Sequence, residues 1–130
     1  MTVVVGYVPG AVGAAALAAG VEEARHRGLP LVVVNSTRAD RLVDPRYSQG
    51  EDWRSTVARL EASGVAHDVR HFTSSTTPAD DLLTVAEDVG ASLLVIGVRR
   101  RTAIGKLILG STAQTVLLQA ECPVLAVKPG

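Results

Sequence analysis

The chain has few residues that form covalent cross-links or aromatic contacts. It holds one cysteine, Cys122, among 130 residues, so no intrachain disulfide can form and a cytoplasmic location is expected. Aromatic residues make up only 3% of the chain and hydrophobic residues 47%, so the core must consist mainly of Val, Leu, Ile and Ala. Such small and β-branched side chains suit strands that closely packed helices cover on both faces.

The chain also lacks a surplus of either charge. It carries 13 Lys and Arg residues against 13 Asp and Glu residues, for a formal net charge of +0. Because binding to a phosphate backbone needs a basic surplus, nucleic acid is not expected as the main partner. Any site that depends on positive charge must therefore be local.

The uncharged N-terminal stretch, residues 1–21, lacks the features of a leader or a membrane anchor. No basic residues precede its apolar run. Gly6, Pro9 and Gly10 interrupt the run where a membrane-spanning helix would have to continue. The stretch divides into a strand and a helix instead, and no membrane partner is expected. The length predicts a single domain, residues 1–130.

Short apolar runs alternate with amphipathic stretches along the chain. β-branched runs predict strands at residues 2–8, 31–35, 65–72, 92–96 and 124–128. Helical spacing and end signals predict helices at residues 11–27, from a cap at Ser48 to Gly64, from a cap at Thr77 to Gly90, and at residues 111–120. This alternation favours an α/β fold, with parallel strands, right-handed crossovers and helices on both faces of an open sheet.

Some local signals refine this arrangement. The 65–72 run is less apolar than the others, so we place it at an edge of the sheet, whereas the 92–96 run is the most central by composition. In the last helix, Val116, Leu117 and Ala120 are expected to point inward.

The stretch from Leu93 to Thr112, LLVIGVRRRTAIGKLILGST, is typical of an anion site. A strand ends at Gly97, a loop with four cations follows, and Gly110-Ser111-Thr112 opens a helix. In open α/β sheets, ligands bind beyond the carboxyl ends of the strands, where the strand order reverses. The connections after the first and fourth strands, at residues 8–10 and 97–109, are therefore expected to be neighbours.

Several of these features also have interpretations that involve no ligand and no catalysis. Gly110-Ser111-Thr112 is either a phosphate cradle or only a helix cap, and the spacing from Gly97 favours the cradle. The arginine run at residues 99–101 either binds phosphate or forms a solvated turn. The histidines show no metal-ligand spacing, Cys122 is expected to be a structural thiol, and no triad is evident. No catalytic residue is therefore assigned, and an efficient hydrolase is not expected.

The C-terminal third, VIGVRRRTAIGKLILGSTAQTVLLQAECPVLAVK, resembles the universal stress protein family, and the resemblance extends over nearly the whole chain. That family has a Rossmann-like, five-stranded parallel sheet of the adenine nucleotide alpha-hydrolase type, with strand order 3-2-1-4-5. Its nucleotide-binding members carry G-x2-G-x9-G-[ST] after the fourth strand. Gly97, Gly110 and Ser111 match this pattern, but Arg100 replaces the second glycine, and Val8 stands where members often carry an acid.

The resemblance implies binding of an adenine nucleotide, ATP or AMP, possibly with Mg²⁺. It also implies a dimeric sensor or regulator of the stress response with at most slow ATP hydrolysis. The expected binding residues are Val8, Pro9, Gly10 and Val34, with adenine against Pro9 and Val34, and Gly97, Arg99, Arg100, Gly110, Ser111 and Thr112 around the phosphates. Loss of the acid at Val8 should weaken metal-assisted binding more than binding of the anion itself.

The resemblance also implies a homodimer through the last strand, at Val124, Leu125, Ala126 and Val127, because an apolar terminal strand would otherwise be an exposed edge. The alternative is a dimeric member of the same family that binds no nucleotide and acts as a protein-interaction module. The arginine run would then be a docking or solvated surface.

Overall fold

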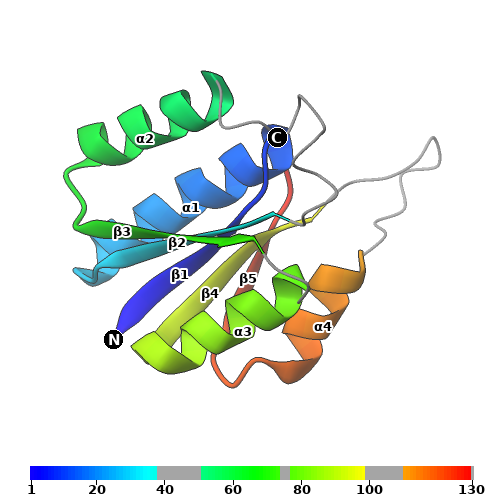
Figure 1. Cartoon of the computed structure of the whole chain (residues 1–130). Helices are drawn as coiled ribbons and strands as arrows, with labels where there is room; N and C mark the ends of the chain where they lie inside the picture. Colours follow the sequence, from blue (N-terminus) through cyan, green and yellow to red (C-terminus); the bar gives the residue numbers. More distant parts are fainter. Residues whose placement is uncertain (38–50, 74–76, 99–109, 130) are drawn as a thin grey trace.

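The computed structural model describes residues 1–37, 51–73, 77–98 and 110–129. Its strands form one parallel sheet in the order β3-β2-β1-β4-β5, which confirms the expected strand order (Figure 1). The strands are β1 Thr2–Tyr7, β2 Leu31–Thr37, β3 His67–Thr73, β4 Ala91–Gly97 and β5 Val124–Val127. The helices are α1 Ala11–Arg27, α2 Glu51–Ser63, α3 Pro78–Val89 and α4 Ser111–Gln119. The capping box expected at Ser48 lies outside the described residues.

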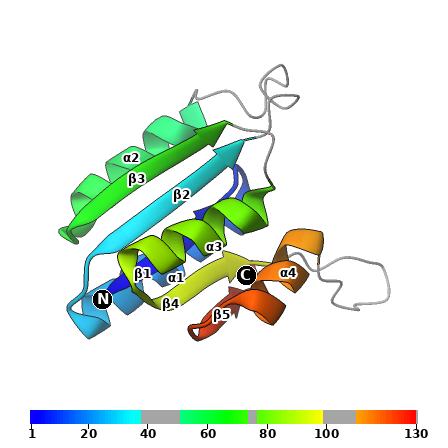
Figure 2. The same cartoon turned by 60° about the horizontal axis from the view of Figure 1, so that its bottom comes forward.

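The helices cover both faces of the sheet, as Figures 1 and 2 show. On one face, Leu17 of α1 and Leu60 of α2 pack with odd-numbered residues of β1, such as Val3 and Val5. On the other face, α3 and α4 pack on Val4 and on alternate residues of β2 and β4, as expected for buried parallel strands. The even distribution of apolar side chains over both faces of β1 explains its continuous β-branched sequence.

The position of β3 at a sheet edge confirms the expectation drawn from its polar composition. The expectation that the 92–96 run is the most central strand is wrong, because β1 occupies the centre and β4 lies between β1 and β5. Both strands have neighbours on each side and helices on each face, so an apolar run does not distinguish them.

The ends of α3 and α4 test two predictions about helices. The hydroxyl oxygen of Thr77 accepts a hydrogen bond from the Asp80 backbone N–H at 3.1 Å, and Pro78 begins α3, as predicted. In α4, Val116 is fully buried, but Leu117 is 40% exposed and Leu118 is 85% exposed. The prediction that Leu117 points inward is therefore wrong, since only one stripe of this short helix reaches the sheet.

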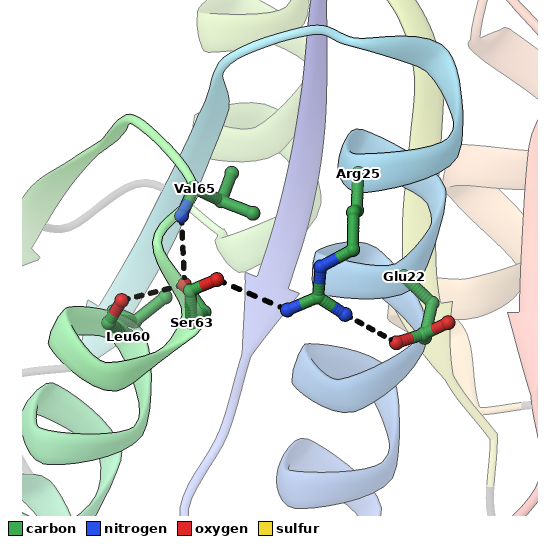
Figure 3. Close-up of polar contacts among 5 residues, drawn as sticks. All are labelled: Glu22, Arg25, Leu60, Ser63 and Val65. Atoms are coloured by element: carbon green, nitrogen blue, oxygen red, sulfur yellow. Dashed lines mark hydrogen bonds and ion pairs between the residues drawn. The ribbon is translucent and has the colours of Figure 1, made fainter.

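Helices α1 and α2 are tied together at the end of α2, as Figure 3 shows. The Arg25 guanidinium donates to the Ser63 carbonyl oxygen at 3.0 Å and to Glu22 Oε1 at 2.6 Å. Ser63 Oγ donates to the Leu60 carbonyl oxygen at 2.6 Å and accepts from the Val65 N–H at 3.1 Å. These bonds use carbonyl groups that the last turn of a helix leaves without intrahelical partners.

A search of the described helices for a segment long and apolar enough to cross a membrane finds none. The uncharged N-terminal stretch instead forms β1 and most of α1, as expected.

Candidate functional site

The strand order reverses between β1 and β4. The first and fourth strands pair directly in parallel, with Val3 opposite Leu93 and Val5 opposite Val95. Helix α1 leaves the carboxyl end of β1 on one face, and α4 follows β4 on the other (Figure 2). The connections after β1 and β4 therefore start side by side, as predicted, and this edge is where an open α/β sheet binds its ligands.

The first turn of α1 lies very close to the connection that precedes it. Gly10 caps the helix with φ +101°, a conformation that favours glycine. A Cβ added at Gly13 would lie 1.6 Å from the carbonyl oxygen of Val8. Gly13 is not among the predicted site residues, although its place in the first turn of a helix is the signal that would have identified it.

Gly97 has a packing role in the described structure. A Cβ added there would lie 2.5 Å from Val12 Cγ1 and 2.6 Å from the Val12 carbonyl oxygen. The first glycine of the sequence motif therefore lets α1 approach the end of β4. Close contact between α1 and β4 accounts for this glycine without any ligand.

Gly110 differs from Gly97 and Gly10. It is the N-cap of α4, but its φ is −70°, which any residue adopts. A Cβ added there would have no neighbour within 4 Å among the described residues. Neither backbone conformation nor a contact within the described residues requires glycine at this position.

Helices α1 and α4 share an unusual N-terminus. Among the described residues, no side chain caps either helix, and neither helix has an acid in its first turn. By contrast, α3 has the Thr77 cap and also Asp80 and Asp81 in its first turn. The first N–H groups of a helix have no intrahelical partners and carry partial positive charge. Two such positive ends border the point where the strand order reverses.

The other residues predicted to bind the nucleotide differ in their burial and in the element to which they belong. Val8 and Pro9 are half-buried beside the start of α1, Ser111 is exposed, and Thr112 is half-buried. Val34 is buried with Leu82 in the cluster under α3, so its side chain belongs to the core. Arg99 and Arg100 lie outside the described residues.

A polar and aromatic cluster lies at the same edge, beneath α2. Asn35 Nδ2 lies 3.3 Å from His71 Nδ1, and Thr56 Oγ1 donates to the Tyr7 hydroxyl oxygen at 3.0 Å. The Trp53 ring meets the rings of Tyr7 and His71 edge to face, with centroids 5.6 and 4.9 Å apart. This cluster is not among the predicted features, although Asn35 at the end of an apolar strand is a signal for it in the sequence. Its groups bond to one another and dock α2 on the sheet.

The described side chains provide little for catalysis. No group of three or more His, Cys, Asp or Glu residues is placed to hold a metal ion within the described part of the chain. The histidines at 26, 67 and 71 are exposed, in keeping with the predicted surface and edge positions. Burial raises the pKa of the half-buried Cys122 thiol, more than a backbone hydrogen bond lowers it, so the thiol form is favoured at neutral pH.

Comparison with known proteins places these features in a family. A family model described as "Universal stress protein family" matches residues 1–128. A universal stress protein of Mycolicibacterium smegmatis is 42% identical over 127 residues, which cover 98% of this chain and 97% of that protein. A universal stress protein structure from Archaeoglobus fulgidus aligns with a TM-score of 0.80 at 33% identity over 98% of both chains. A structure from the same organism in complex with dAMP aligns with a TM-score of 0.73 at 28% identity, also over 98% of both chains.

Proposed function

This chain belongs to the universal stress protein family, and we propose that it binds an adenine nucleotide, ATP or AMP, at the carboxyl edge of β1 and β4. The binding would serve a sensor or regulator of the stress response. A universal stress protein structure that aligns over 98% of both chains is in complex with dAMP, which supports an adenine mononucleotide as the ligand class. A cytoplasmic location remains a prediction.

Gly110 carries the proposal, because no described residue lies within 4 Å of a Cβ added there. The glycine heads a helix whose first N–H groups have no capping side chain among the described residues. A phosphate bound to these N–H groups must approach the backbone closely, and a side chain at position 110 would obstruct it. Gly110 is the N-cap of α4, as the alternative interpretation expects, and we favour the cradle because no described side chain caps the first N–H groups of the helix.

The proposed pose follows from these positions. The phosphates lie against the N-terminus of α4, with Gly110, Ser111 and Thr112, while the base lies toward Pro9 at the end of β1. Gly97 contributes by holding α1 against β4, and Val34 contributes as part of the floor. The cations of residues 99–106 add positive charge to the connection that leads into α4. With no catalytic group assigned, ATP hydrolysis is at most slow.

Nucleotide binding is tested by calorimetry and thermal unfolding with ATP and with AMP. A ligand that binds only the folded chain stabilises it by RT ln(1 + [L]/Kd), so millimolar nucleotide should raise the midpoint of unfolding. GTP serves as the control for the base. Absence of heat and of any midpoint shift with both adenine nucleotides would contradict the proposal and favour the interaction module, for which the exposed Leu118 would be a natural contact.

We also propose that two copies associate through β5. Among the described residues, β5 pairs with β4 alone and forms an edge of the sheet. Its residues are apolar and only partly covered, and Leu125 is 37% exposed. An apolar edge strand of this kind is a template for pairing with a second chain, and a two-fold dimer would cover it.

Replacing Leu125 with aspartate should convert the dimer to a monomer, because two copies of the strand would bring carboxylates into an apolar interface without partners. The dissociation constant should rise at least about a hundredfold, because each copy would bury one unpaired carboxylate and an uncompensated buried charge costs roughly 3 kcal/mol or more. Sedimentation equilibrium measures the dissociation constant of the dimer. Ala62→Asp, at an exposed position on α2, is the control. A monomeric native chain, or an L125D dimer of unchanged affinity, would exclude this interface.

A further inference from the structure

We propose that α2 positions the nucleotide site, because Trp53 and Thr56 hold Tyr7, and with it the end of β1, in the arrangement that receives the base. The inference rests on the proposed function, in which the base lies toward Pro9. It gives a role in binding to a helix that does not have to touch the ligand. Tyr7 and Thr56 are then positioning residues for the nucleotide.

The ends of three neighbouring strands present a row of polar and aromatic side chains. Tyr7 is the last residue of β1 and pairs with Asn35 of β2, which in turn pairs with His71 of β3. Because aligned residues of neighbouring strands point to the same face of a sheet, the three side chains lie side by side. Tyr7 packs there with the core residues under α1 and α2. The row therefore crosses the carboxyl edge of the sheet on the face that α2 covers.

The N-terminal half of α2 rests on this row. The Trp53 ring meets the rings of Tyr7 and His71, with centroids 5.6 and 4.9 Å apart, so it spans the row from its first member to its last. One turn later, Thr56 Oγ1 donates to the Tyr7 hydroxyl oxygen at 3.0 Å, and both residues are buried. A hydrogen bond between buried groups fixes the two side chains relative to each other, because its loss is costly away from water.

The turn that follows Tyr7 is held from its other side by α1. Gly13 of α1 lies so close to the preceding turn that an added Cβ would be 1.6 Å from the Val8 carbonyl oxygen. Pro9, the next residue, has its φ fixed by its own ring. A short, stiff turn held at both ends follows any shift of those ends, so a displaced Tyr7 would displace Pro9.

The C-terminal end of α2 is attached separately, at the opposite edge of the sheet. There the Arg25 guanidinium of α1 donates to the Ser63 carbonyl oxygen at 3.0 Å (Figure 3). Leu60, between the two attachments, is buried in the core. Removing the Arg25 side chain loosens the far end of the same helix and leaves the contacts of the row in place, which makes it a matched control.

A purely structural role for the row predicts a different result from a positioning role. If Tyr7 and Thr56 only dock α2, their loss lowers the free energy of unfolding but leaves the affinity of the folded chain for nucleotide unchanged. If they position the turn, the folded chain without their bond adopts the binding-competent arrangement less often, and the apparent Kd rises in proportion. The Kd for nucleotide therefore separates the two roles.

The experiment is calorimetric titration of AMP into the full native chain and into Tyr7→Phe, Thr56→Val and Arg25→Ala variants of it. Phenylalanine keeps the ring that packs on Trp53, and valine keeps the shape of threonine, so each of these two changes removes one hydroxyl. Each should raise the Kd for AMP about three- to tenfold, the equivalent of one net hydrogen bond. Arg25→Ala should stay within about twofold of the native chain.

A double variant, Tyr7→Phe with Thr56→Val, tests whether the two hydroxyls act through their mutual bond. Its Kd for AMP should match that of the single variants, because a bond that is already lost cannot be lost again. Circular dichroism and urea unfolding show that each sample is folded. The single variants remove the same bond from opposite sides, so one of them suffices if the other does not fold.

The outcomes separate this inference from the proposed function. Native affinity for AMP in a folded Tyr7→Phe or Thr56→Val variant would overturn the inference and leave the proposed function standing. An equally large loss in Arg25→Ala would do the same, and so would losses that add in the double variant. Absence of AMP binding by the native chain would overturn the proposed function itself.

Discussion

Replacing Gly13 with alanine should lower the free energy of unfolding by about 3 kcal/mol, at the upper end of the range for overpacking. The new Cβ would lie 1.6 Å from the Val8 carbonyl oxygen, far inside any van der Waals contact. The obstructing atom belongs to the backbone, so no side chain can rotate away, and α1 would have to move off the sheet. Urea unfolding measures the change.

The expected loss of stability in Gly13→Ala is informative because it is opposite in sign to the usual effect of replacing glycine with alanine in a helix. In a helix without such a contact, alanine is favoured over glycine by about 1 kcal/mol. Gly110→Ala is the matched control, because a Cβ there meets no described atom within 4 Å and φ is already −70°. Its unfolding free energy should change by less than about 1 kcal/mol. A Gly13→Ala variant as stable as the native chain would show that α1 does not pack as described.

Gly110→Val should weaken nucleotide binding at least about tenfold, a loss of roughly 1.4 kcal/mol or more. The branched side chain would occupy the space that a phosphate needs to reach the N–H groups of α4. Stability should fall by only about 1 kcal/mol, the cost of a poor N-cap residue. Calorimetry with AMP measures the affinity, and urea unfolding measures the stability of the same sample.

Arg100→Ala distinguishes two ways of holding the phosphate. If the backbone of α4 is the cradle, AMP affinity should be unchanged or slightly higher in this variant. A large loss with Arg100→Ala and none with Gly110→Val would show that a side-chain clamp binds the phosphate and that the glycine is incidental.

Local signals in the sequence predicted local structure well. Thr77 and Pro78 marked the start of α3 because a cap requires only neighbouring residues. The polar composition of β3 placed it at an edge, since a buried strand cannot carry exposed histidines. The strand order came from the family resemblance, because apolar runs alone do not reveal which strands are neighbours. For that reason β4 was taken for the central strand in place of β1.

The site was predicted less completely than the fold. The meeting of the connections after β1 and β4 followed from the topology. The different roles of the glycines did not, because a glycine that admits a helix and a glycine that admits a ligand look the same in a sequence. Only the positions of neighbouring atoms separate Gly97, where an added Cβ would meet Val12, from Gly110, where it would meet no described residue. The exposure of Leu117 was missed because the width of the buried stripe on α4 depends on tertiary packing.

The contact of Trp53 with Tyr7 and His71 gives the molecule an internal optical reporter. The chain has one tryptophan, so its tryptophan fluorescence, excited selectively over that of the two tyrosines, arises from α2 alone and reports whether that helix rests on the ends of β1 and β3. Far-ultraviolet circular dichroism reports the sheet and all the helices together. Coincident transitions by the two signals mean that α2 unfolds with the sheet, and an earlier fluorescence transition means that it detaches as a separate unit.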